Sequence, residues 1–380
     1  MSTSPPSEFA THRVAERFVA HGPPLSFRRL CTEVLSSRTS YLILDLDGTV
    51  HLRRNLGELL GWELSAYRAY GLPTMERLES GRHSARWLFD WGDPRRLVRY
   101  VIGAASDWTG PGMRYLLWSK LASSSPRLRR AGFRRFRGDP IRIAQRGVQT
   151  TLMDQLASES PELVPILMER IWQRHRDDQV ITAEDIAWIR TSFPNIEIVL
   201  SSASPQPVVS FVAERLGIEH AHGSTPDRIN SGEAKIELLE QTFARFGEPG
   251  VEVVGISDTA HGDDHCWSQH FTRVVDINSP APFPPIVSER SPLEEVHSAT
   301  VLSRNELEKR ALDPAYLDTR RHGGGPAWRR ELARSELLGA MDTLLQRFNA
   351  IVRDANPLAD PVDVAYRLSV LRESSRAQLA

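Results

Sequence analysis

Residues 41–50, YLILDLDGTV, are the stretch of sequence that decides the fold. The first four, Tyr41 to Leu44, form a short apolar run of good strand formers, which is typical of a buried parallel strand. Asp45 then lies at the carboxyl end of this strand. Ligands bind at that end in open α/β sheets, because the chain turns there and exposes backbone amides beside side chains. The stretch predicts an α/β fold with a doubly wound parallel sheet and a ligand site at Asp45.

Two aspartates in this stretch are candidates for covalent phosphate chemistry. The carboxylate of Asp45 can attack phosphorus and form an aspartyl-phosphate. Strand alternation aims Asp47 at the same space, where it can protonate a leaving oxygen and later deprotonate water. Gly48 and Thr49 predict a tight turn whose amides hold phosphate oxygens. An ordinary acidic turn after a strand is the alternative.

Two further predicted strands also end in polar residues. Residues 196–200 lead into a serine-rich segment, where a hydroxyl can bind a phosphoryl group. Ser202 is the first candidate for that contact and Ser201 the second. Serine-rich turns are also common helix caps, so this segment does not decide the function by itself. Residues 251–257 form the other strand, which leads into Asp258.

Lys235 opens an amphipathic run that predicts a helix. Lysine is rare in this chain, because only positions 120, 235 and 309 among its 47 lysine and arginine residues are lysine. A compact ammonium neutralises phosphate and a carboxylate as a point charge, whereas a planar guanidinium requires a forked geometry. Lys235 is therefore a candidate phosphate contact, and a solvated lysine at a helix start is the alternative.

The aspartates at the first and third strand ends predict a magnesium site. Mg²⁺ prefers oxygen ligands and keeps several waters. Asp45, the backbone carbonyl of Asp47 and Asp258 provide a suitable protein share of its octahedron, with Asp263 as the additional acid. The segment 261–266 also contains histidine and cysteine, which suggests zinc as the alternative. Its spacing matches no paired Cys/His zinc signature.

Taken together, these segments resemble the four motifs of the haloacid dehalogenase superfamily. The motifs read, in chain order, Asp45-Leu46-Asp47-Gly48-Thr49, Ser202, Lys235, and Asp258 with Asp263. The resemblance implies that Asp45 is the nucleophile, Asp47 the general acid/base, and Ser202 and Lys235 the phosphate contacts. It also implies Mg²⁺ as the cofactor. The segment 200–205 is most similar to the branch that contains phosphoserine phosphatase.

The fourth motif departs from the pattern of many relatives. It reads Ser257-Asp258 where Gly-Asp is common, and Asp263 is followed by a second acid, Asp264. Which of these two acids completes the metal site is left open by the sequence.

The first motif favours phosphate chemistry within this superfamily, because dehalogenases lack its second aspartate. A phosphonate-cleaving enzyme would require a Schiff-base lysine in the insert. Lys120, the only lysine there, has polar surroundings that do not indicate a depressed pKa. The predicted function is Mg²⁺-dependent hydrolysis of a phosphomonoester. A phosphotransferase using the same intermediate and a non-catalytic anion- or lipid-binding protein are the alternatives.

The resemblance covers the predicted catalytic core, residues 39–56 and 192–290. Residues 57–191 read as mostly helical and imply a cap inserted after the first motif, which excludes water and selects the substrate. Residues 1–38 are expected to be a mobile tail followed by a helix, and 291–380 a helical extension that packs on the body or on a second subunit.

Charge and composition limit the partners. Arg53 and Arg54 follow the first motif and can meet a small phosphorylated substrate, or form ion pairs at the hinge. Residues 114–146 contain ten basic residues and one acid. Residues 126–137 within them predict a basic helix that contacts anionic lipid weakly or is simply solvated. A net charge of −1 argues against a dedicated nucleic-acid binder.

The location predicted from the sequence is cytoplasmic. The chain has two cysteines and no visible secretory signal, which favours a reducing compartment. No stretch contains the roughly 20 uninterrupted apolar residues that a membrane span requires.

Overall fold

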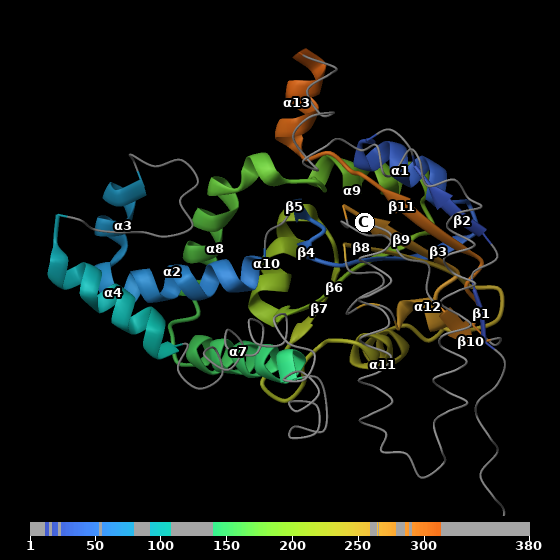
Figure 1. Ribbon diagram of the computed structural model, residues 1–380. Coiled ribbons are helices and arrows are strands. Elements are labelled where there is room, and N and C mark those ends of the chain that lie inside the picture. Colours follow the sequence, from blue (N-terminus) through green and yellow to red (C-terminus); the bar gives the residue numbers. More distant parts are fainter. Residues whose placement is uncertain are drawn as a thin grey trace, which may run out of the picture.

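A seven-stranded parallel sheet forms the centre of the fold (Figure 1). The computed structural model describes residues 12–14, 17–21, 24–52, 55–79, 92–107, 140–258, 264, 266–278, 286–288 and 291–312. In spatial order the strands are β2 (Arg17–Ala20), β11 (Glu295–Ala299), β9 (Arg273–Ile277), β8 (Glu252–Ser257), β3 (Thr39–Leu44), β6 (Glu197–Pro205) and β7 (His220–Ser224). Every neighbouring pair is parallel. The three strands predicted from apolar runs are β3, β6 and β8.

Helices cover both faces of this sheet, so the predicted doubly wound fold is confirmed. α1 (Phe27–Val34), α9 (Ala183–Ser192) and α10 (Gln206–Leu216) cover one face, and α11 (Glu233–Thr242) and α12 (Trp267–His270) cover the other. The central strand β3 is buried on both faces of the sheet. Leu42 and Leu44 pack into the first apolar cluster, whereas Tyr41 and Ile43 pack into the second. Because successive side chains alternate between faces, a strand buried on both sides is apolar throughout.

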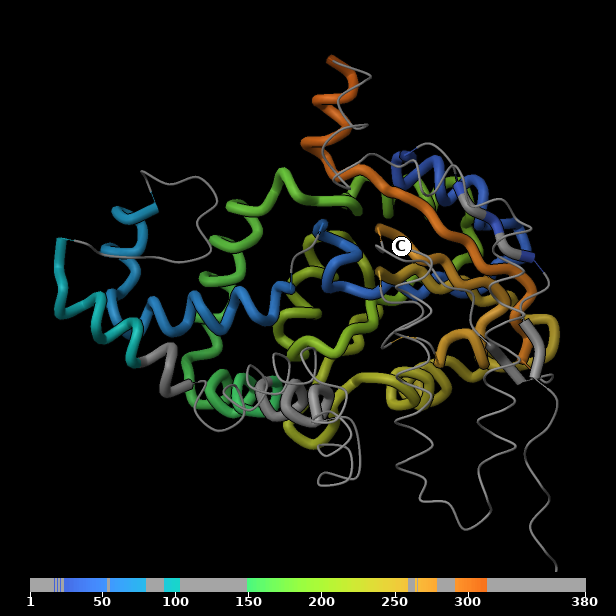
Figure 2. Tube along the Cα trace, in the orientation of Figure 1, coloured from blue at the N-terminus to red at the C-terminus, as the bar shows by residue number. Residues whose placement is uncertain are grey.

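Five described α-helices lie between residue 52 and α9 in the chain. They are α2 (Leu56–Tyr70), α3 (Leu72–Glu79), α4 (Pro94–Asp107), α7 (Pro140–Ala157) and α8 (Leu163–Arg174), followed by the short η1 (Arg176–Asp178). They lie to one side of the sheet (Figure 2). Glu63 on α2 is 4% exposed and accepts a hydrogen bond from Arg174 on α8 at 2.5 Å. Arg170 pairs with Glu79 at 2.6 Å, so buried ion pairs join α2, α3 and α8.

The sheet extends beyond the segments expected from the sequence. Strands β2 and β11 belong to the main sheet, so the expectation of helix alone after a mobile N-terminal tail and after residue 290 is wrong at these positions. The remaining described elements are β1 (His12–Val14), paired antiparallel with β10 (Ile286–Ser288), the pair β4 (Asp47–Gly48) and β5 (His51–Leu52), and α13 (Arg304–Leu312). β2 and β11 are short and contain charged or polar residues, so they do not stand out as apolar runs in the sequence.

Several predictions lie outside the described residues. They concern the hinge arginines Arg53 and Arg54, the basic segment 126–137, Asp263, and the chain after residue 312 with its expected role in subunit contacts. Among the helices that are described, none has both the length and the apolar composition needed to cross a membrane.

A buried histidine makes folding sensitive to acid. His222 on β7 is 7% exposed, and its Nε2 lies 3.3 Å from the Thr242 hydroxyl. Its Nδ1 has no hydrogen-bond partner in the described part of the chain. Burial lowers the pKa of His222 to about 4, and the nearby His220 and Arg228 act in the same direction.

Replacing His222 by Gln is expected to reduce the loss of stability in acid. The unfolded chain takes up a proton near the ordinary histidine pKa of about 6.5, well above the folded value, so stability falls as the pH decreases from about 7 to 4. Urea unfolding at pH 7 and pH 4.5 measures this loss, which we expect to be about 1–3 kcal/mol larger in the wild type than in His222→Gln. The control His270→Gln, at a half-buried histidine, should resemble the wild type. Equal losses in all three proteins would contradict the prediction.

Candidate active site

The candidate site lies where three neighbouring strands end. Strands β3, β6 and β8 are adjacent in the sheet, with β3 in the middle. Their carboxyl ends deliver Asp45, Ser202 and Asp258 to one edge, as parallel strands must when they run side by side. Lys235 reaches the same edge from the first turn of α11. The four segments that carry the predicted motifs are therefore brought together.

Lys235 forms the central contact of this site. Its ammonium donates to Asp45 Oδ1 at 2.9 Å and to Asp264 Oδ1 at 2.6 Å. Asp264 Oδ2 in turn accepts from the Ser257 hydroxyl at 2.7 Å. The ammonium also lies 5.1 Å from the centre of the Trp267 ring. All of these side chains are buried, so the arrangement is a charged cluster enclosed by the protein.

Burial and mutual repulsion change the acidity of this cluster. Burial raises the pKa of Asp45, the Lys235 ammonium opposes the rise, and Asp264 and Asp47 add to it. Burial alone would lower the pKa of Lys235, but the carboxylates of Asp264 and Asp45 outweigh it and raise that pKa above its ordinary value. Lys235 is therefore a permanent cation that stabilises the ionised form of Asp45.

Asp47 has different partners from Asp45. Its Oδ1 accepts from the backbone N–H of Leu56 at 2.7 Å, and its Oδ2 accepts from the Ser204 hydroxyl at 2.6 Å. The Ser202 hydroxyl lies farther from Oδ2, at 3.5 Å. Burial raises the pKa of Asp47, while the hydrogen bonds from Ser204 and Leu56 limit the rise. Asp47 is thus fixed by neutral donors, whereas Asp45 is fixed by a charge.

The two candidate serines of β6 have separate surroundings. Ser202 Oγ accepts from the backbone N–H of Ser204 at 3.1 Å and lies on the Asp47 side. Ser201 Oγ instead accepts from Asn230 Nδ2 at 3.3 Å. Asn230 also donates to the carbonyl oxygen of Ser202 at 3.1 Å. Of the two serines, only Ser202 has a hydroxyl near Asp47 in the described structure. Asn230, which supports this strand end, was not found from the sequence.

A close approach between loops fixes Asp258. Gly48 has φ of +79°, and a Cβ atom there would lie 2.0 Å from Asp258 Oδ2, so no side chain fits. The backbone N–H of Asp258 donates to the Thr49 hydroxyl oxygen at 3.1 Å. The Thr49 amide donates to the carbonyl of Leu46 at 3.2 Å. That amide is therefore engaged inside the turn and is not available to a phosphate oxygen, contrary to the role predicted for it.

The donor set at this edge fits a hard cation. Asp258 Oδ1 is buried and has no hydrogen-bond partner among the described residues. Burial raises the pKa of Asp258 to about 8, and Asp45, Asp264 and Asp47 add to the rise. Repelling carboxylates of this kind are stabilised by a divalent ion with oxygen ligands. The described part of the chain contains no group of three Asp, Glu, His or Cys side chains already placed for a metal.

The acid next to Asp263 takes part in the cluster. Asp264 is 1% exposed and contacts Lys235 directly, so it braces the ammonium. Asp263 lies outside the described residues. Burial raises the pKa of Cys266, in the segment that suggested zinc, to about 12, which keeps its thiol protonated at neutral pH.

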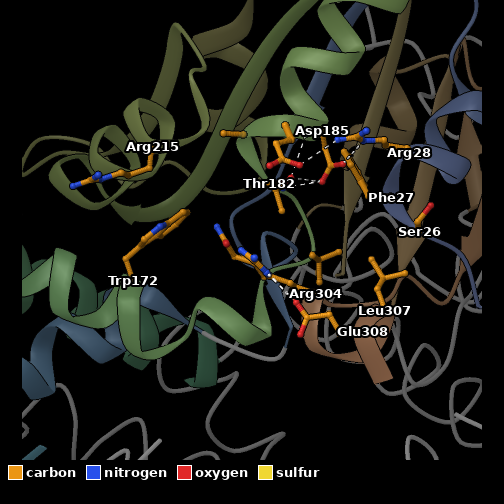
Figure 3. Close-up of a pocket in the computed structure, with 14 residues that line it drawn as sticks. Ser26, Phe27, Arg28, Trp172, Thr182, Asp185, Arg215, Arg304, Leu307 and Glu308 are labelled. Carbon is orange, nitrogen blue, oxygen red and sulfur yellow. Dashed lines mark hydrogen bonds and ion pairs between the residues drawn. The ribbon is translucent and has the colours of Figure 1, made fainter. Parts of the chain in front are cut away.

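A separate cavity of about 600 Å³ is lined by residues of α1, α8, α9, α10 and α13 (Figure 3). Its lining includes Trp172, Arg28 and Arg304, and none of the predicted site residues. The arginines are already paired, because Arg28 contacts Asp185 at 2.7 Å and Arg304 contacts Glu308 at 3.4 Å. The predicted site residues therefore lie outside this cavity.

Comparisons with known proteins find similarity in structure. No protein family matches the sequence, and no curated protein matches it. A protein of unknown function from Bordetella pertussis Tohama I is 14% identical with a TM-score of 0.38, over 63% of this chain and 91% of that one. A phosphoserine phosphatase, solved as an analogue of its phospho-aspartyl intermediate, is 10% identical with a TM-score of 0.31, over 72% and 98%.

A phosphoserine phosphohydrolase-like protein from Francisella tularensis is also similar. It is 12% identical with a TM-score of 0.30, over 72% of this chain and all of that one.

Removing the central cation is expected to destabilise the protein. Lys235→Met leaves the buried carboxylates of Asp45 and Asp264 without their ammonium, and breaking a buried ion pair on one side costs about 3–5 kcal/mol. Urea unfolding at pH 7 measures the free energy of unfolding. The matched control is Lys309→Met on the exposed surface of α13, which should change it by less than about 0.5 kcal/mol. A Lys235→Met protein as stable as this control would contradict the importance of the ion pair.

Proposed function

We propose that this protein is a Mg²⁺-dependent phosphatase that hydrolyses a small phosphomonoester through an aspartyl-phosphate on Asp45. The observation that carries the proposal is the pairing of two aspartates with different partners. Asp45 is bound to the Lys235 ammonium at 2.9 Å, and Asp47, two residues on, is held by neutral donors. A nucleophile must stay ionised, and a general acid must be able to carry a proton.

In the first step, an ionised oxygen of Asp45 attacks the phosphorus of the ester. A new O–P bond forms, the bond from phosphorus to the alcohol oxygen breaks, and Asp47 gives its proton to that departing oxygen. Lys235 reduces the repulsion between the Asp45 carboxylate and the anionic phosphoryl group. Ser202 is the proposed hydroxyl donor to a phosphoryl oxygen, because it lies beside Asp47 at the end of β6.

In the second step, water attacks the phosphorus of the aspartyl-phosphate. Asp47, now ionised, takes a proton from that water, and the O–P bond to Asp45 breaks. The products are inorganic phosphate and the regenerated Asp45 carboxylate. Asp47 therefore gives up one proton as an acid in the first step and takes one back as a base in the second.

Asp45, Asp258 and the backbone carbonyl of Asp47 are the proposed Mg²⁺ ligands, with Asp263 as a candidate for the additional acid. When bound, the ion supplies positive charge that offsets the charge on the phosphoryl oxygens. Asp258 Oδ1, which is buried and has no hydrogen-bond partner within the described structure, supports this assignment.

The helices α2, α3, α4, α7 and α8 are proposed to act as the cap over this site. Their first member, α2, begins at the site itself, because the Leu56 amide in its first turn donates to Asp47. A covering domain excludes water from the charged cluster and selects the alcohol part of the substrate. The hinge arginines Arg53 and Arg54 are proposed contacts for its anionic groups.

Phosphate release is expected to depend on Asp45. Asp45→Asn removes the charge needed for attack while keeping the size of the side chain, so release from a panel of phosphomonoesters with Mg²⁺ should fall more than about 1,000-fold. The matched control is Asp154→Asn, at an exposed position on α7, which should retain wild-type rates. Urea unfolding checks that both variants fold. An Asp45→Asn protein with the wild-type rate would rule out the mechanism.

Mg²⁺ is expected to stabilise the folded protein through Asp258. Binding to the folded state alone adds about 2.7 kcal/mol at a concentration 100 times the Kd. Thermal unfolding with Mg²⁺ and with a chelator measures this gain, which should be lost in Asp258→Asn. Without Mg²⁺ the variant should be at least as stable as the wild type, because it removes repulsion among buried carboxylates. An equal gain from Mg²⁺ in both proteins would exclude Asp258 as a ligand.

A further inference from the structure

Ser204 makes the shortest described contact to Asp47, although the sequence motifs do not include it. Its hydroxyl donates to Asp47 Oδ2 at 2.6 Å, and the serine is 3% exposed. The other oxygen, Oδ1, accepts from the Leu56 amide at 2.7 Å. Both oxygens of Asp47 therefore have a defined donor.

These two donors restrict where Asp47 can carry a proton. A backbone N–H only donates, so Oδ1 must remain an acceptor while Leu56 is in place. A protonated carboxyl oxygen can still accept one hydrogen bond, so each oxygen of Asp47 has one lone-pair direction open to a proton. On Oδ2 the Ser204 hydroxyl occupies the other direction, and it therefore fixes where a proton on Oδ2 can point.

Ser204 is itself held rigidly. The following residue is Pro205, which restricts the backbone of Ser204 to extended conformations. The Ser204 amide donates to Ser202 Oγ at 3.1 Å. A Cβ atom on Gly57 would lie 2.7 Å from Ser204 Oγ, so the first turn of α2 leaves room for this hydroxyl only because residue 57 is glycine. The hydroxyl has little freedom to leave Asp47.

We infer that Ser204 is a positioning residue that directs the proton of Asp47 toward the leaving oxygen of the substrate. The inference rests on the proposed function and adds a residue to it. Ser202 is a weaker candidate for this role, because its hydroxyl is 3.5 Å from Oδ2. Ser204 acts through Asp47 and does not itself touch the phosphoryl group.

The kinetic test compares two esters that differ in their need for an acid. The alcohol of glycerol 2-phosphate must be protonated as it leaves, whereas 4-nitrophenolate leaves readily as an anion. The ratio kcat/KM reports the steps up to cleavage of the ester bond. For Ser204→Ala we expect kcat/KM to fall about tenfold or more for glycerol 2-phosphate and less than about twofold for 4-nitrophenyl phosphate.

The matched control is Ser201→Ala, which removes a buried hydroxyl from the same strand. That hydroxyl contacts Asn230 instead of Asp47. Any effect of this variant should be the same for both esters. A Ser204→Ala protein that loses kcat/KM equally for both esters, or for neither, would overturn the inference.

Crystal structures of the wild type and Ser204→Ala test the contact without turnover. Asp47 Oδ2 is expected to move or take several positions in the variant, while Asp45 keeps its contact with Lys235. An Asp47 carboxylate that stays unchanged would overturn the positioning role. A wild type that hydrolyses neither ester would overturn the proposed function instead, and the two crystal structures would still decide whether Ser204 fixes Asp47.

Discussion

The buried contact of Lys235 with Asp45 and Asp264 is the constraint on which the rest of the site depends. Charges that are taken out of water are tolerated only when they are paired, so α11, the end of β3 and Asp264 must meet at one point. That meeting places Asp258 against Gly48 and closes the edge of the sheet. The same contact also has a chemical consequence, since the ammonium opposes the rise that burial causes in the pKa of Asp45. Stability and reactivity thus have a common origin here.

The parallel sheet brings the other residues of the candidate site to the same edge as this contact. Because β3 lies between β6 and β8, residues far apart in sequence reach one edge of the sheet. The alternation of side chains along a strand then selects which of them face the site. Ser202 and Ser204 both contact Asp47, whereas Ser201, one residue before Ser202 and so on the opposite face of the strand, contacts Asn230. A shift of one residue in β6 would exchange these two sets.

The sequence predicts the central part of this architecture because buried parallel strands are apolar throughout. β3, β6 and β8 have that composition, and each is followed by the polar residues that meet at the site. β2 and β11 escape prediction because they are short and contain residues such as Arg17 and His297. Ser204 lies two residues after Ser202, so strand alternation predicts that both face the same side. A serine before a proline is also typical of a helix cap, however. The bracing role of Asp264 depends on the path of a loop, which the spacing of acids does not determine.

The two aspartates of the first motif illustrate how one side chain type can have two roles. Asp45 is buried and Asp47 is half-buried, and this desolvation raises the pKa of each. Their partners then separate them. An ammonium contacts Asp45 and stabilises its charge, whereas an amide and a hydroxyl contact Asp47 and leave one direction of Oδ2 free for a proton. Exchanging these surroundings would exchange the roles, because the carboxylates themselves are identical. The proposed division between nucleophile and acid therefore depends on Lys235, Ser204 and the first turn of α2, and the two residues of spacing between the aspartates only bring them into the same space.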